Sequence, residues 1–168
     1  FNSGEDSTTV LANFSITNGS GQLNWNEEWI VGGGIYVQNS YPLLTNLHIF
    51  NNTAEGASAI YFYDWVYLKN SIIDNNDGEG IRITQGSEDK DYIFVNNLII
   101  NNNDGFYFSH CEPLLDKVTI TNNLSDGIKR VYVAENDTLE VFLFYDHYLA
   151  QIETMENELK IQNYVGFS

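Results

Sequence analysis

The sequence predicts an all-β solenoid of about five stacked rungs, and three observations support this fold class. An eight-residue segment recurs five times, a second short apolar segment follows each copy, and 22 of the 168 residues are asparagine while only two are proline. Asparagine is a poor helix former but tolerates the left-handed backbone angles of tight turns. This composition therefore favours short strands joined by turns.

The longer repeat has the pattern aliphatic-x-Asn-x-x-Ile-x-Asn. Its copies begin at Leu11, Leu44, Leu68, Val95 and Leu115. The alternation of apolar residues predicts strands with one buried face. The alternation breaks at Asn46 and its equivalents, where we expect the chain to bend in the left-handed conformation.

Stacking of such units predicts two asparagine columns whose side-chain amides hydrogen-bond from rung to rung. The expected first column is Asn13, Asn46, Asn70 and Asn97. The expected second column is Asn18, Asn51, Asn75, Asn102 and Asn122. Lys117 interrupts the first column at the fifth copy, which suggests that the regular stack ends near there.

The shorter motif reads small-apolar-x-apolar. Its copies are Gly34–Val37, Ala59–Phe62, Gly80–Ile83, Gly105–Phe108 and Gly127–Arg130, the last of which departs from the pattern at Arg130. Because neighbouring rungs lie about 4.8 Å apart, the outward residues of these strands should form one column. Its expected members are Tyr36, Tyr61, Arg82, Tyr107 and Lys129, with Tyr63 beside them.

Aromatic rings with cations suit carbohydrate recognition, because rings stack on sugar faces and cations pair with carboxylates. The column is therefore the candidate polysaccharide-binding surface. The alternative is that these tyrosines only cover the sheet, since Tyr is a favourable strand residue.

The runs Gly32–Val37 and Pro42–Asn52 resemble repeats of right-handed parallel β-helix proteins, the pectin-lyase-like fold. The similarity covers about residues 8–133, and the Asn-rich, GGGIY-type repeats resemble those of bacterial surface proteins. The resemblance implies the fold but not one function, because this fold carries lyases, hydrolases, adhesins and tailspikes. A leucine-rich repeat lacks support because the helical half is missing, and a β-sandwich would not produce asparagines in fixed phase.

Two loops and the C-terminus depart from the repeat. The loop 19–31 carries Trp25 and Trp29, which we expect either to fold over the open end of the solenoid or to stack on a ligand. The loop 84–91 is polar and charged, as expected of a solvated segment. We divide the chain into β-helix repeats at 1–137 and a segment at 138–168, a strand followed by a helix or hairpin, which caps the last rung or contacts another subunit.

The formal net charge is −16, from 7 Lys and Arg against 23 Asp and Glu. Nucleic acid is therefore not an expected partner. No apolar stretch approaches the roughly 20 residues of a membrane span, so no membrane insertion is expected. The chain starts at Phe1 rather than Met, so we expect a processed product or an excised fragment whose signal peptide lies outside this sequence.

Catalytic groups are sparse. The resemblance implies a lyase option, in which an Arg or Lys base works beside calcium-binding acids, and only Arg82 sits on the expected column. No cofactor is required, but calcium is an option at the oxygen-rich turns, with Asp74, Asp77, Glu79 and Asp104 as candidate ligands. Asp77 and Asp104 are expected at equivalent turn positions. The polygalacturonase signatures and a paired-carboxylate arrangement are missing from the sequence, and the three histidines are isolated along it.

These observations favour a non-enzymatic, extracellular or cell-surface β-helix module that is adhesin-like and contacts a polysaccharide or cell-surface glycan. One alternative is a structural subunit of an extracellular fibre or surface assembly, in which the chain's partner is itself through end-to-end stacking. A second alternative is a polysaccharide lyase acting on uronate-containing glycans.

Overall fold

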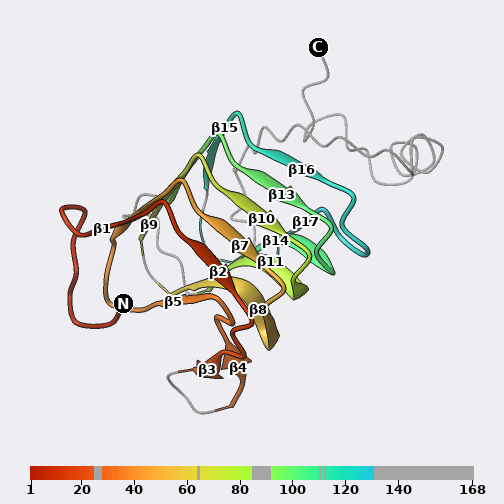
Figure 1. The fold of residues 1–168 in the computed structure, drawn as a ribbon, viewed down its shortest axis with the longest axis horizontal. Coiled ribbons are helices and arrows are strands. Elements are labelled where there is room, and N and C mark those ends of the chain that lie inside the picture. Colours follow the sequence, from red (N-terminus) through yellow and green to blue (C-terminus); the bar gives the residue numbers. More distant parts are fainter. Residues whose placement is uncertain (25–27, 64, 85–91, 110, 112, 131–168) are drawn as a thin grey trace.

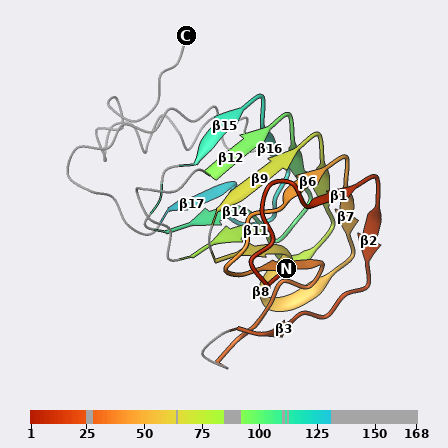
Figure 2. The same cartoon turned by 90° about the vertical axis from the view of Figure 1, so that its left-hand side faces the viewer.

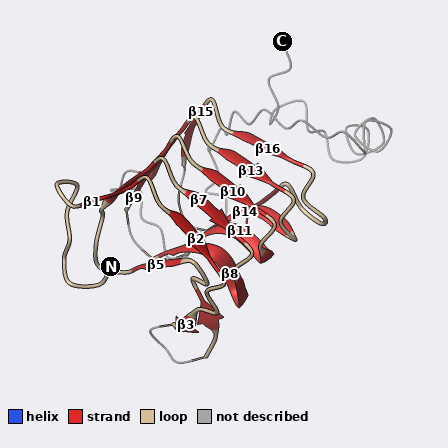
Figure 3. Ribbon diagram, in the orientation of Figure 1, coloured by secondary structure: helices blue, strands red, loops and turns tan. Residues whose placement is uncertain are grey.

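The computed structural model describes residues 1–24, 28–63, 65–84, 92–109, 111 and 113–130. These residues wind into a parallel β-helix in which three short strands make one rung, and the rungs stack along one axis (Figures 1 and 3). Within these ranges the regular structure is strand, with no helix long and apolar enough to cross a membrane. The predicted strand, helix or hairpin at 138–168 lies outside the described residues.

The first sheet contains five parallel strands that each open a rung. They are β1 (Val10–Ala12), β6 (Leu43–Thr45), β9 (Val66–Lys69), β12 (Tyr92–Val95) and β15 (Leu114–Asp116). Their central inward residues lie in one register row, namely Leu11, Leu44, Leu68, Phe94 and Leu115. The fourth member is Phe94, so the repeat phase at this rung begins one residue before the predicted Val95.

After each strand of the first sheet the chain turns one corner and enters the second sheet. Its parallel strands are β2 (Ser15–Thr17), β7 (His48–Phe50), β10 (Ile72–Asp74), β13 (Leu98–Ile100) and β16 (Thr119–Thr121). The central residue of every strand is isoleucine, and the five stack in register at Ile16, Ile49, Ile73, Ile99 and Ile120. Four members are the Ile of the repeat pattern, and at the fourth rung the column residue is Ile99 rather than the predicted Ile100, the same one-residue shift.

The third sheet carries the shorter motif. Its parallel strands are β5 (Ile35–Val37), β8 (Thr53–Phe62), β11 (Asp77–Ile83), β14 (Asp104–Phe108) and β17 (Ile128–Arg130). A two-stranded antiparallel hairpin, β3 (Gln22–Leu23) and β4 (Ile30–Val31), projects from the first rung beside β8 (Figures 1 and 2).

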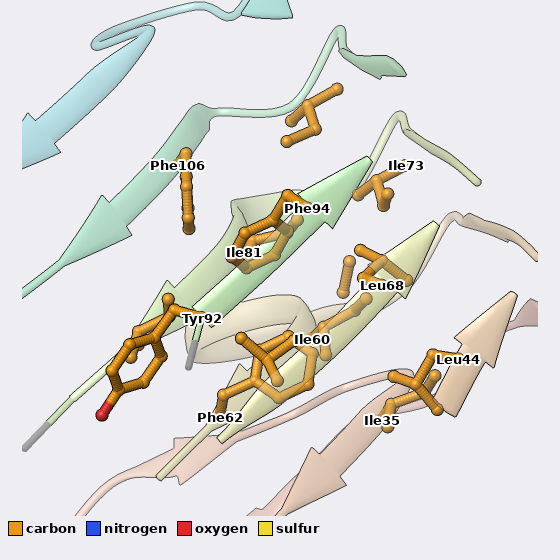
Figure 4. Close-up of a cluster of buried hydrophobic side chains, with 14 of the residues drawn as sticks. Ile35, Leu44, Ile60, Phe62, Leu68, Ile73, Ile81, Tyr92, Phe94 and Phe106 are labelled. Carbon is orange, nitrogen blue, oxygen red and sulfur yellow. The ribbon is translucent and has the colours of Figure 1, made fainter. Parts of the chain in front are cut away.

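The three sheets enclose one continuous apolar core. Phe62, Phe94, Phe106 and Phe108 are fully buried in it and contact one another at ring-centroid distances of 4.9 to 6.3 Å (Figure 4). Burying each ring contributes roughly 1.5–3 kcal/mol. The Phe62–Phe94 contact joins different rungs, the Phe94–Phe106 contact links the first and third sheets within the fourth rung, and the Phe106–Phe108 contact lies within β14.

The predicted left-handed corners are confirmed, with a one-residue shift at the fourth rung. The first corner is Asn13, Asn46, Asn70, Asn96 and Lys117, and the second is Asn18, Asn51, Asn75, Asn101 and Asn122; all have φ between 51° and 62°. The assignments of Asn97 and Asn102 to these corners were wrong. Two adjacent asparagines occur at each of those places, and the pattern was matched to the second one.

The buried hydrogen-bond ladder lies one residue later than predicted at three rungs, whereas at the fourth rung it contains the predicted Asn102. Asn52 donates its amide to Asn76 Oδ1 at 3.0 Å, and Asn76 donates to Asn102 Oδ1 at 2.9 Å. Asn102 in turn donates to Asn123 Oδ1 at 3.3 Å. The corner asparagines are exposed because the left-handed residue directs its side chain outward, so the following residue faces the core. In the first corner, Asn96 donates its side-chain amide to Asn70 Oδ1 at 3.0 Å.

Candidate functional site

The predicted column on the third sheet is confirmed in its register. Tyr36 pairs with Tyr61, Tyr61 with Arg82, Arg82 with Tyr107, and Tyr107 with Lys129. The spacing of the shorter motif was sufficient to align these five residues. Alignment in register does not by itself make them accessible, and the loop of the first rung changes their exposure.

The hairpin β3–β4 covers the first-rung end of this column. Tyr61 is only 4% exposed and packs in a small cluster with Val31 and Ala57. Tyr36 lies against the same cluster, and its ring stacks on that of Tyr61 with centroids 5.4 Å apart and planes 2° apart. Tyr61 is therefore inaccessible as a ligand contact in this arrangement, whereas Tyr36, Tyr63 and Tyr107 are partly exposed.

A long second-rung strand holds the hairpin in place. The N–H groups of Gly32 and Gly33 both donate to the carbonyl oxygen of Ala57, at 2.8 and 3.3 Å. The Ile30 N–H donates to Glu55 Oε2 at 3.2 Å. A side chain at Gly56 would meet Val31 Cγ1 at 2.9 Å, so glycine permits the close approach of the hairpin. Sequence reasoning placed the loop at an open end or on a ligand; in the structure it lies on the outer face of the sheet.

Arg82 is the centre of the polar part of the site. Its Nη1 lies 2.8 and 3.1 Å from the two carboxylate oxygens of Glu79, and the two side chains are 14% and 12% exposed. The guanidinium carbon is 4.1 Å from the Tyr107 ring centroid and 5.4 Å from that of Trp29. Trp29 is 47% exposed, so its ring borders this cluster and faces solvent. The other predicted tryptophan, Trp25, lies outside the described residues.

Burial changes the acidity of the stacked phenols. Loss of solvation, with smaller contributions from Tyr61 and Tyr63, raises the pKa of Tyr36 to about 12. Burial also raises the pKa of Tyr61, although the hydrogen bond with Thr84 opposes this shift. Both rings are neutral at physiological pH and act as apolar surfaces with a polar tip.

The four predicted calcium ligands are not brought together. Asp74 lies on the second sheet and contacts His48 Nε2 at 2.6 Å, and Glu79 is paired with Arg82. Asp77 is level with Thr53, whereas Asp104 is level with Glu79, so the expected equivalence of Asp77 and Asp104 was wrong. The strand irregularity around Gly78 displaces the register there. In the described part of the chain, no cluster of three or more His, Cys, Asp or Glu side chains is placed to hold a metal ion.

Two features were not predicted from the sequence. His48, isolated along the chain, pairs with Asp74 and stacks on Phe50 with centroids 4.3 Å apart. A groove of about 380 Å³ also opens beside the first sheet and is lined by Ser7, Tyr41, Trp65, Val66, Tyr67 and Ile93. One signal could have located it: Tyr41 and Trp65 each stand two residues before Leu43 and Tyr67, which pair in register.

Comparison with known proteins agrees with this architecture. The family described as "right handed beta helix region" matches residues 3–142. The searches of curated proteins and of solved structures each return no match. The family match spans most of the chain and agrees with the three parallel sheets, so this chain belongs to the right-handed β-helix family.

Proposed function

We propose that this β-helix domain is a non-enzymatic, extracellular module that contacts carbohydrate through the outer face of the third sheet. The observation that carries the proposal is the cluster of Trp29, Arg82 and Tyr107. An exposed indole borders an arginine whose guanidinium also lies over a partly exposed phenol ring. Flat rings with neighbouring polar groups are suited to the apolar faces and hydroxyls of sugars.

The charge around the cluster favours a neutral glycan over a uronate polymer. Glu79 already pairs with the Arg82 guanidinium, which reduces its attraction for a substrate carboxylate. The chain carries a formal net charge of −16, which repels polyanions at ordinary ionic strength. Neutral hexose polymers are therefore the expected ligands.

The ion pair also weighs against the lyase alternative. A general base must reach the proton that it removes and have a nitrogen available to accept it. Arg82 is largely buried, and its Nη1 contacts both oxygens of Glu79. The fibre-subunit alternative depends on residues 138–168, outside the described part of the chain, and stays a hypothesis.

The test is affinity electrophoresis or calorimetry with a panel of neutral and uronate polysaccharides. We expect neutral polymers to bind and Trp29→Ala and Tyr107→Ala each to weaken binding by roughly fivefold to a hundredfold, the equivalent of about 1–3 kcal/mol. Tyr41→Ala serves as the matched control, because Tyr41 is an exposed aromatic on a different face.

Equal binding by Trp29→Ala and the unaltered protein would refute this placement of the site. Shortening of any polysaccharide during the incubation would refute the non-enzymatic role, and Arg82→Lys would then be the first variant to assay.

A further inference from the structure

The groove beside the first sheet is built from aromatic side chains of successive rungs. The rings of Tyr41 and Trp65 meet with centroids 5.0 Å apart and planes inclined at 64°. Tyr67 and Ile93 form another wall from the outward positions of β9 and β12, which pair in register. Tyr41 is 39% exposed, so its ring is open to solvent. The volume of about 380 Å³ falls within the range of small-ligand pockets.

An N-terminal segment fixes the first wall. The Tyr41 N–H donates to the carbonyl oxygen of Glu5 at 2.8 Å. The Glu5 carboxylate accepts a hydrogen bond from Ser40 Oγ at 2.7 Å and another from the Ser3 N–H at 2.9 Å. Ser7 from the same segment lines the groove. The position of Tyr41 is thus set by the hydrogen bond of its own N–H and by that of the preceding residue, Ser40.

The rings and charges around the groove favour a cationic ligand. The described lining residues are uncharged, and the faces of aromatic rings attract cations. Two carboxylates, Glu5 and Asp6, stand in the segment that forms the wall, and the chain as a whole carries 16 excess negative charges. One ammonium group already occupies such a position, because Lys69 Nζ lies 5.4 Å from the centroid of the Tyr67 ring.

We propose that this groove binds an organic ammonium group, of the quaternary or methylated kind, against the rings of Tyr41, Trp65 and Tyr67. The site is separate from the Trp29–Arg82–Tyr107 cluster and does not depend on the carbohydrate function. Its ligand would be a cation with an apolar surface, which loses less hydration than a primary amine when it enters an aromatic groove.

The experiment titrates the full chain with choline and with 3,3-dimethyl-1-butanol, an uncharged molecule of the same shape. The signal followed is the indole N–H of Trp65 in a two-dimensional NMR spectrum, assigned with Trp65→Phe. We expect millimolar binding of choline at this indole and binding of the neutral isostere at least about fivefold weaker, the size of a partly exposed cation–π contact.

Three variants make the result specific. Tyr41→Ala should weaken choline binding several-fold, and Trp29→Ala should leave it unchanged. Lys69→Gln should strengthen choline binding, because the competing ammonium over Tyr67 is removed. A misfolded variant would not bind more tightly, so this gain cannot be explained by loss of folding. Equal affinity for the neutral isostere, a stronger response to a neutral sugar such as maltose, or no response at Trp65 would each overturn the proposal.

Discussion

Asn76 donates its side-chain amide to Asn102 Oδ1 at 2.9 Å while its own Oδ1 accepts from the backbone and the side chain of Asn52. The three buried ladder asparagines, Asn52, Asn76 and Asn102, thus each join three rungs. Every ladder amide also reaches a carbonyl of the preceding rung, as Asn76 does to Ile49 at 3.1 Å. The ladder satisfies polar groups that the corners would otherwise bury without partners.

Replacement of Asn76 by Ala should therefore be strongly destabilising. It leaves the Asn52 N–H and one hydrogen of the Asn52 amide without their acceptor, and it removes the side-chain donor to Asn102 Oδ1, which keeps only the Asn76 N–H. Each unsatisfied buried group costs about 1–3 kcal/mol, so we expect the free energy of unfolding to fall by about 3 kcal/mol or more. Urea denaturation followed by circular dichroism measures this change.

The matched control is Asn75→Gly at the adjacent corner. Asn75 is exposed with φ of 52°, a conformation that glycine adopts freely. We expect a change below about 1 kcal/mol. A loss as large as that of Asn76→Ala would show that the exposed corner amides, rather than the buried ladder, stabilise the stack.

Lys117 occupies the first corner at the fifth rung, where the other four rungs have asparagine. Its φ of 54° places a residue with a long side chain in the left-handed region, which costs roughly 1–2 kcal/mol for residues other than Gly, Asn and Asp. Lys117→Asn should raise the free energy of unfolding by about 1 kcal/mol, seen as a melting temperature about 2–4 °C higher. A lower melting temperature for the variant would contradict this explanation.

Much of the architecture follows from the sequence because a parallel stack repeats the same local chemistry. The Ile column at four of its five rungs and the Tyr36–Tyr61–Arg82–Tyr107 register follow directly from motif spacing. The fourth rung was shifted because Phe94 and Val95 are both apolar and both precede paired asparagines, so two alignments fit the pattern equally well. Only the structure distinguishes them, through the burial of Phe94.

The candidate sites were less predictable, since they depend on segments that do not repeat. Nothing in the periodicity indicates that Val31 packs on Tyr61 and thereby removes it from solvent. The Glu79–Arg82 ion pair turns a supposed metal ligand and a supposed base into partners of each other. The Tyr41–Trp65 contact joins two turns whose residue types differ, so only their equal offset from the paired Leu43 and Tyr67 marks it, and no shared motif does.

The covered phenols should be visible in an alkaline titration. The pKa of Tyr36 is raised to about 12 from an ordinary value of 10.0. The stability contributed by neutral Tyr36 is therefore complete below pH 10, and it is lost as the pH rises through 12, because the unfolded state ionises first. Tyrosinate absorbance should show a late-titrating group that disappears in Tyr36→Phe.

A variant of the β3–β4 hairpin tests whether hairpin packing causes the raised pKa values of Tyr36 and Tyr61. Val31→Ser keeps the backbone of β4 but weakens its packing on Ala57 and Tyr61. We expect the late-titrating phenols to ionise at lower pH than in the unaltered protein. An unchanged titration in a folded Val31→Ser variant would mean that hairpin packing does not control the solvation of these rings.

Glu5 gives the opposite pH dependence at the acid end. Hydrogen bonds from the Ser3 N–H and then from Ser40 lower the pKa of its carboxyl to about 2 from an ordinary value of 4.5. The group contributes stability above pH 4.5, and this contribution is lost as the pH falls through about 2. The melting temperature of Glu5→Gln should lie below that of the unaltered protein at pH 6, and the two should converge near pH 2. Because the Glu5 carboxylate also accepts from Ser40 Oγ, next to Tyr41, the same variant should broaden or shift the Trp65 indole signal. A constant gap between the two melting temperatures across this pH range would contradict the assigned hydrogen bonds.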